Sequence, residues 1–322
     1  MSCQWSLHSR ILLQRLGTWA GEMRKSLGFL LFYVVLWCSS AAYLAVKGAD
    51  WTFPIVSLAI FGVALSGLAY FLTKRADPPP IEVKRPNLEL SAVLIYLAVF
   101  AIFFLGFGMT MVRAVFPPGR EQDLLVLAAK LVASVVAPAI LLSALGVRLA
   151  PLFSARVDKP GFWPTLIVLS AVLIGLLSVV TPSLTQIGAL HPALGVLAWA
   201  APASFVWMAL EAGLTEEFLF RAVLQSRLSA VLKTEAGAVV IGAVLFSLAH
   251  VPGLFLRGTP ETEGYSKDIL QVAAYSIAAL SPLAILFGVV WARTRSLLLV
   301  VLLHAVVDVL PNMPDFLKVW AL

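Results

Sequence analysis

The sequence predicts an all-α, polytopic transmembrane helical bundle with eight or nine membrane-embedded helices. Three observations predict it: an apolar composition, a series of long apolar runs, and a bias of basic residues toward one set of loops. Of the 322 residues, 61% are hydrophobic and 12% are charged, and the mean hydropathy is +0.96. Soluble domains carry about 25% charged residues. A bilayer is the solvent that suits this chain.

Apolar runs of spanning length follow one another along the chain. One helical span needs roughly 20 apolar residues. The runs cover residues 27–46, 53–73, 91–112, 124–147, 164–188, 194–214, 236–256, 269–292 and 297–311. Residues 215–233 form a further helical stretch of mixed character. The last run is short for a full span, so we expect it to be partly buried in protein.

The first apolar run reads as a retained span and not as a cleaved signal peptide. Residues 27–46 exceed the apolar core of about 7–15 residues that a signal peptide carries. Further along, residues 76–90 are rich in proline and charge, which predicts a loop. The two cysteines, Cys3 and Cys38, do not form the pattern of a disulfide framework.

Basic residues in the loops predict an orientation. With the N-terminus inside, sixteen Lys and Arg fall in inside segments and six in outside segments, and Lys130 lies within an apolar run. This bias is what the positive-inside rule expects. The net charge of +6 therefore reads as a topology signal, and we expect no nucleic acid partner. The predicted location is a bacterial inner (plasma) membrane with a cytoplasmic N-terminus, although a eukaryotic reticulum membrane fits the same pattern.

Ionisable residues divide the chain into two parts. Residues 1–190 hold few such groups inside their apolar runs and are interpreted as scaffold helices, whereas residues 191–322 are interpreted as the functional helical core. A charged group near the centre of a membrane helix costs about 2.5–3.5 kcal/mol on insertion scales. Each one is therefore a hypothesis of function.

The first polar stretch is LTEEFLFRAVLQSRL, residues 214–228. Glu217 and Arg221 have the i, i+4 spacing of a helical ion pair. Glu216 points about 100° away from Glu217, which leaves it free to face a cavity. The alternative is an interfacial helix with ordinary surface charges, and Arg227 fits that alternative.

Two further apolar helices carry histidines. His250 follows Phe246 by one turn, and Pro252 then ends or kinks the helix. His304 and Asp308 lie one turn apart in a run of leucine and valine. Either histidine alone could be a structural, hydrogen-bonded residue.

The three stretches together have more specific meaning than any one of them. A carboxylate and a histidine can activate water, and a second polar pair can stabilise the negative charge on a carbonyl oxygen. Those are the groups that hydrolysis of an amide bond needs.

The order EExxxR, FxxxH and HxxxD, each on its own apolar helix, resembles the type II CAAX prenyl protease and bacteriocin-processing (CPBP) family of intramembrane glutamic endopeptidases. The resemblance covers roughly residues 195–311. Its motifs fall on Glu216, Glu217 and Arg221, on Phe246 and His250, and on His304 and Asp308.

The resemblance implies roles for these residues. Glu216 would be the general base, with His250 helping to polarise the water. His304 and residue 308 would hold the oxyanion, and the Glu217–Arg221 pair would fix the helix. The prenyl-protease branch has asparagine where this chain has Asp308, and an ionised aspartate cannot donate a hydrogen bond. Either Asp308 is protonated, or it orients His304 and leaves the oxyanion to that ring.

We therefore expect an intramembrane endopeptidase that uses no cofactor and no metal. The water between Glu216 and His250 would sit in a cavity opening toward the cytoplasmic leaflet. The expected partners are the lipid bilayer and a peptide or protein substrate, either prenylated or membrane-bound. Two alternatives stay open. One is a zinc enzyme, and the other is a non-catalytic transporter, bacteriocin-immunity protein or scaffold membrane protein.

Overall fold

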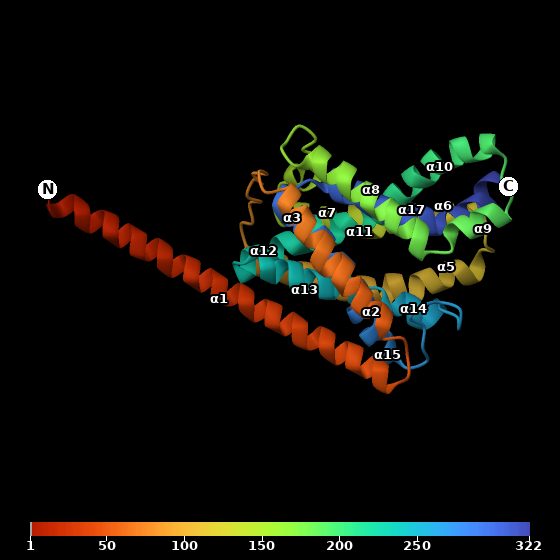
Figure 1. Ribbon diagram of the computed structural model, residues 1–322, viewed down its shortest axis with the longest axis horizontal. Coiled ribbons are helices and arrows are strands. Elements are labelled where there is room, and N and C mark those ends of the chain that lie inside the picture. Colours follow the sequence, from red (N-terminus) through yellow and green to blue (C-terminus); the bar gives the residue numbers. More distant parts are fainter. Residues whose placement is uncertain (1) are drawn as a thin grey trace.

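The computed structural model describes residues 2–322, and the side chains from residue 21 onward. All regular elements within these residues are helices (Figure 1). Nine of the described helices are long and apolar enough to cross a membrane, which confirms the predicted all-α bundle. They are Gly21–Val46, Thr52–Leu72, Pro86–Val115, Arg120–Ala144, Phe162–Val180, Leu194–Leu232, Glu235–Arg257, Ile269–Thr294 and Leu297–Ala321.

Most of the spans combine α-helical and π-helical segments. In chain order the elements are α1 (Ser2–Val46), α2 (Thr52–Ser57), η1 (Leu58–Leu65), α3 (Ser66–Leu72), α4 (Pro86–Val99), η2 (Phe100–Gly108), α5 (Met109–Val115), α6 (Arg120–Leu131), η3 (Val132–Val136), α7 (Ala137–Ala144), η4 (Ala150–Phe153), α8 (Phe162–Val180), α9 (Ser183–Ala189), α10 (Leu194–Met208), η5 (Ala209–Leu214), α11 (Thr215–Glu217), η6 (Phe218–Gln225), α12 (Ser226–Leu232), α13 (Glu235–Leu248), α14 (Val251–Arg257), α15 (Ile269–Tyr275), η7 (Ser276–Leu280), α16 (Ser281–Thr294), α17 (Leu297–Phe316) and η8 (Leu317–Ala321). Of these, η4 is a 3-10 turn and the other η segments are π-helical.

The connections between spans gather at two opposite ends of the bundle. We call one the basic end; it holds the connections 73–85, 145–161, 233–234 and 295–296. The other is the far end, which holds the connections 47–51, 116–119, 181–193 and 258–268 and the C-terminus. In Figure 1 the basic end lies on the left, near α3 and α12, and the far end lies on the right, near α5 and α9.

Local chemistry explains where several helices start and stop. The Asp268 carboxylate accepts a hydrogen bond from the backbone N–H of Leu270 and caps α15. The Ser296 hydroxyl oxygen caps α17 in the same way, at 3.2 Å from the backbone nitrogen of Leu299. Lys233, in the left-handed conformation, ends α12 at the basic end.

The observed spans differ from the predicted runs in two places. Residues 194–214 and 215–233 form one continuous helix, Leu194–Leu232, because the polar residues of its second half turn into the protein. The last helix runs on to Ala321 through Pro311 and Pro314, well beyond the predicted end at residue 311. More than half of the residues in its most apolar 18-residue stretch are buried, which confirms the expectation of partial burial.

The core that positions the site lies around α17, α16 and η6. The side chains of Phe218, Phe287 and Trp291 are fully buried in it. The first span packs from outside against α13, α15 and η7, where the Trp37 indole donates to the carbonyl oxygen of Ala278 at 2.9 Å. The free thiol of Cys38 is exposed on the same helix, and the side chain of Cys3 lies outside the described residues.

Candidate active site

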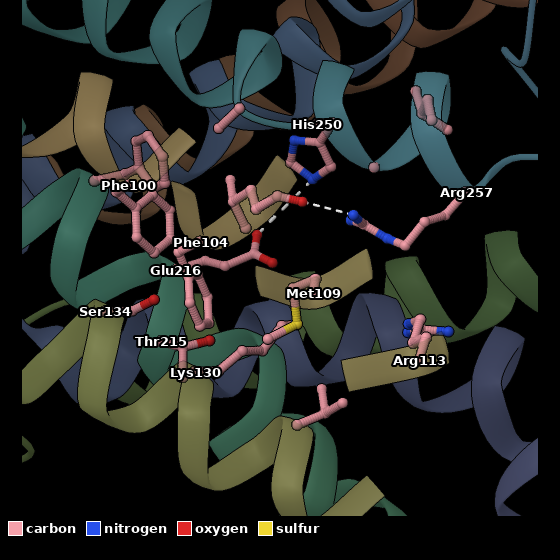
Figure 2. A pocket seen from close by; sticks show the side chains of 16 residues that line it. Phe100, Phe104, Met109, Arg113, Lys130, Ser134, Thr215, Glu216, His250 and Arg257 are labelled. Carbon is pink, nitrogen blue, oxygen red and sulfur yellow. Dashed lines mark hydrogen bonds and ion pairs between the residues drawn. The ribbon is translucent and has the colours of Figure 1, made fainter. Parts of the chain in front are cut away.

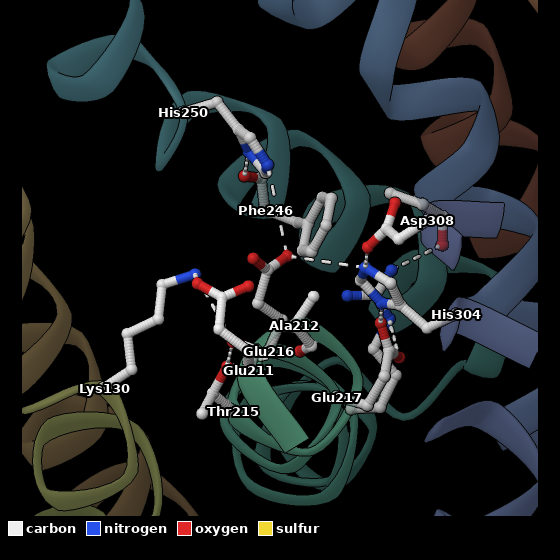
Figure 3. A network of polar contacts seen from close by, with 12 residues as sticks. Lys130, Glu211, Ala212, Thr215, Glu216, Glu217, Phe246, His250, His304 and Asp308 are labelled. Atoms are coloured by element: carbon white, nitrogen blue, oxygen red, sulfur yellow. Dashed lines mark hydrogen bonds and ion pairs between the residues drawn. The ribbon is translucent and has the colours of Figure 1, made fainter. Parts of the chain in front are cut away.

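Two adjacent glutamates on α11 point in different directions. Glu217 is fully buried, whereas the Glu216 side chain is 24% exposed and faces a cavity. This divergence is what neighbouring positions on a helix produce. Figure 3 shows Glu216 at the centre of a polar network and Glu217 next to His304.

Glu217 forms the predicted helical ion pair. Its Oε2 lies 3.1 Å from Arg221 Nε, and both side chains are almost fully buried. Arg221 also donates to the carbonyl oxygen of Ala284 at 3.2 Å, and its guanidinium lies 4.3 Å from the centre of the Phe246 ring. The aromatic face and the carboxylate together compensate a charge that would be costly to bury alone.

His304 lies between two carboxylates. Its Nδ1 is 2.7 Å from Glu217 Oε1, and its Nε2 is 3.2 Å from Asp308 Oδ2. The imidazole stacks on the Phe287 ring, with centroids 4.9 Å apart and an interplanar angle of 15°. The ring is therefore held by contacts at both nitrogens and on one face.

His250 stands where α13 breaks. The helix stops at Leu248 and α14 starts at Val251, so the chain bends next to Pro252 as its sequence predicts. His250 Nδ1 lies 3.0 Å from the carbonyl oxygen of Phe246. Since a carbonyl oxygen only accepts, Nδ1 carries the proton and Nε2 is directed toward the cavity.

The two histidines approach the same oxygen of Glu216. Glu216 Oε2 lies 4.0 Å from His250 Nε2 and 3.9 Å from His304 Nε2 (Figure 3). The structure thus brings together the six polar residues named from the sequence, although they come from three separate helices.

A cavity of about 260 Å³ borders Glu216 and His250 (Figure 2). Its walls come from η2, α5, α6, η3, α11, η6, α14 and the turn between α13 and α14, so helices predicted as scaffold line much of it. The division into residues 1–190 and 191–322 stays a prediction. The lining residues are Phe100, Phe104, Leu105, Met109, Arg113, Val126, Lys130, Ser134, Thr215, Glu216, Phe220, Ala249, His250, Gly253, Leu254 and Arg257.

One ion pair beside the cavity, between the lining residue Lys130 and Glu211, was not predicted. Lys130 Nζ lies 2.5 Å from Glu211 Oε1, and each side chain is about one-fifth exposed. The sequence held one signal for this pair: a single lysine lies in one apolar run and a single glutamate in another. Charged residues in membrane spans usually pair with one another. Which partner they find depends on packing.

The interpretation of Arg227 as a surface charge is wrong. Its side chain is fully buried, and its Nε lies 3.4 Å from Oε2 of the equally buried Glu89 on α4. Glu89 also accepts hydrogen bonds from the backbone nitrogens of Lys84 and Arg85. The pair therefore joins α12 to the start of α4 near the basic end.

Among residues 21–322, no three His, Cys, Asp or Glu side chains are grouped to hold a metal ion. The neighbours of Glu216 are instead organised by hydrogen bonds and ion pairs within the protein. The arrangement can take up and release protons at a carboxylate that borders a cavity inside an apolar bundle.

These features define a class: a polytopic membrane protein with carboxylates and histidines clustered inside its helical bundle. A family model described as type II CAAX prenyl endopeptidase Rce1-like matches residues 198–310. This match confirms the predicted resemblance over that segment, to a family of intramembrane endopeptidases. Neither a curated protein nor a solved structure was found to match the chain.

Proposed function

We propose that this protein is an intramembrane endopeptidase in which Glu216 activates a water molecule. The observation that carries the proposal is the separation of 4.0 Å between Glu216 Oε2 and His250 Nε2. This is too long for a direct hydrogen bond. It suits a bridging water, because two hydrogen bonds of about 2.8 Å that meet at about 90° span about 4.0 Å.

The roles follow from the directions of the side chains. His250 Nδ1–H donates to the Phe246 carbonyl oxygen, which leaves Nε2 of the neutral ring as an acceptor for the water. Glu216 takes the other water proton as the oxygen attacks the carbonyl carbon. The tetrahedral intermediate then collapses, the C–N bond breaks, and Glu216 returns the proton to the leaving amine. General acid–base catalysis of this kind contributes about 10²–10⁴-fold in rate.

The contacts of His304 favour one of the two roles considered for Asp308. Glu217 and Asp308 accept at the two ring nitrogens, so an ionised Asp308 orients the ring and His304 carries both protons. Its positive charge then lies 3.9 Å from Glu216 Oε2, close to where negative charge develops on the carbonyl oxygen.

The cavity suits an apolar peptide. Phe100, Phe104, Met109 and Leu254 form part of its wall, and the catalytic carboxylate lies at its side. The family implies peptide substrates. We propose that this substrate is a membrane-bound peptide or protein, prenylated or otherwise anchored.

The test compares membrane proteomes from cells that carry the wild type, Glu216→Gln or His250→Ala. Glu261→Gln, a carboxylate on the exposed loop at the far end, is the matched control. We expect at least one cleavage product to disappear with the first two variants and to persist with the control. If both site variants keep every wild-type product, the proposal is wrong.

The same proteins distinguish the alternatives. Stoichiometric zinc that is lost together with activity would favour a zinc enzyme. Solute flux in proteoliposomes that survives Glu216→Gln would favour a transporter. Under the present proposal, a cleavage product that depends on Glu216 still forms in the presence of chelators.

A further inference from the structure

The cavity is closed toward the basic end of the bundle. Residues 217–228, which lead from the site to that end, are all buried. The cavity residues on this side, Phe100, Ser134 and Phe220, are buried as well. Two fully desolvated ion pairs, Glu217–Arg221 and Arg227–Glu89, lie along the same path. Ion pairs remain desolvated in this way only where water does not enter, so these pairs indicate that no water path leads from the cavity to the basic end.

The opposite wall of the cavity reaches the far end. Arg257 is the last residue of α14, and Arg113 lies in the last turn of α5. Arg113 is exposed, and Arg257 is held half-buried by the carbonyl oxygen of Leu105 at 2.6 Å. Figure 2 shows the two arginines across the cavity from Phe100 and Ser134.

A second hollow of about 240 Å³ continues toward the same end. It shares Arg113 and Val126 with the first cavity and is bordered by Glu211. Its remaining lining includes Asp315 of α17 and Trp320 of η8, which are residues of the far end. The two hollows share part of their lining, and both lie on the far-end side of the cluster.

The charge distribution assigns the two ends to opposite sides of the membrane. Sixteen Lys and Arg belong to the basic end and six to the far end. Removing the three buried residues Arg221, Arg227 and Arg295 from that count leaves thirteen against six. By the positive-inside rule the basic end is cytoplasmic. The first span starts at the basic end, whereas the cavity opens toward the far end. The two expectations from the sequence, a cytoplasmic N-terminus and a cavity open toward the cytoplasmic leaflet, therefore cannot both hold in this fold.

We infer that the Glu216 cavity opens to the non-cytoplasmic side, so that the site takes peptide segments that reach the membrane from outside the cytoplasm. The inference about substrates rests on the proposed peptidase function. The direction of opening does not rest on it, because it follows from the buried path on one side, the exposed mouth on the other, and the loop charges. The two arginines at the mouth make it a favourable entry for segments that carry acidic groups.

The test is the accessibility of single cysteines to a membrane-impermeant maleimide. The background is the full chain with Cys3→Ser and Cys38→Ala. Ala249→Cys reports on the cavity, since Ala249 lines it and the substitution is small. Glu261→Cys reports on the far-end loop, and Asp77→Cys reports on the basic-end loop; both native residues are exposed. Each variant is labelled in spheroplasts and in inverted membrane vesicles.

We expect Ala249→Cys and Glu261→Cys to react in spheroplasts and Asp77→Cys to react only in inverted vesicles. Reaction of Ala249→Cys together with Asp77→Cys would overturn the inference, and so would protection of Ala249→Cys from both sides until detergent is added. Reaction of Glu261→Cys only in inverted vesicles would overturn the orientation. The labelling needs no catalysis. Adding Glu216→Gln to the Ala249→Cys protein leaves the expected pattern unchanged, so a failed peptidase assay and a failed accessibility assay are separate results.

Discussion

Neutralising Glu217 should destabilise the whole protein while leaving its shape and hydropathy almost intact. In Glu217→Gln the amide has nearly the volume of the carboxylate but no charge. The guanidinium of Arg221 then loses its carboxylate partner and keeps the Ala284 carbonyl oxygen and the Phe246 and Phe287 rings, in a fully buried position. The amide also cannot accept from both Arg221 and His304 with the strength of a carboxylate.

The expected loss follows from burial. Breaking one side of a buried ion pair costs about 3–5 kcal/mol, because the remaining charge stays uncompensated. Domains have a free energy of unfolding of about 5–15 kcal/mol, so the variant would lose a substantial share. With about 2–4 °C per kcal/mol, the unfolding midpoint in detergent should fall by about 6–20 °C.

The structure provides a matched control in Glu89→Gln. Glu89 is equally buried and pairs with an equally buried arginine, Arg227, but it lies outside the cavity lining. Both variants should lose stability by similar amounts. Only Glu217→Gln should slow cleavage of a substrate obtained from the proteome comparison, measured below both midpoints, because Glu217 contacts His304 and Glu89 does not.

A double variant checks the cause. Replacing Arg221 by Met in the Glu217→Gln protein removes the unpaired charge and should recover part of the lost stability. A decrease below about 1 kcal/mol for Glu217→Gln, or fully additive losses in the double variant, would refute the argument from desolvation.

Two further predictions concern charges elsewhere in the bundle. Lys130→Met and Glu211→Gln should each destabilise the protein in thermal unfolding, whereas the double variant should lie closer to the wild type, since neither charge is then left unpaired; additive losses would contradict the pairing. At the far end, hydrogen bonds from Lys47 and Tyr43 lower the pKa of Asp268 to about 2, below the usual value of about 3.9. The native state therefore gains from ionised Asp268, and this gain is present above about pH 4 and lost as the pH falls toward 2. The difference in unfolding midpoint between wild type and Asp268→Asn should stay constant from pH 7 to pH 5 and shrink below pH 4, and a constant difference down to pH 2.5 would contradict this.

The sequence predicts those parts of the site that depend on helical spacing. Glu217 with Arg221, and His304 with Asp308, are each four residues apart, and each forms its predicted contact. The meeting of Glu216 with His250 and His304 is a different matter. It requires three helices to pack at one depth, which no periodicity encodes, and the family motif was the signal that indicated it.

Two features, the burial of Arg227 and the direction of the Glu211 side chain, could not be predicted because a local residue pattern does not determine them. The residue pattern around Arg227 suits an interface as well as an interior, and only the approach of Glu89 from α4 decides between them. Glu211 precedes Glu216 by five residues, a spacing that separates side chains on an α-helix. The intervening η5 segment is π-helical and closes i to i+5, so both carboxylates turn toward the cavity side of this helix.

The ion pair between Lys130 and Glu211 has a consequence for how the protein is made. Lys130 lies well inside the span Arg120–Ala144, and its partner follows 81 residues later in the chain. At about 5–20 residues per second, the ribosome needs roughly 4–16 s to supply it. During that interval the nascent fourth span holds a lysine with no carboxylate from the sixth span, at an insertion cost of about 2.5–3.5 kcal/mol. Stable integration of this span is therefore expected to wait for the helix that carries the active-site glutamates.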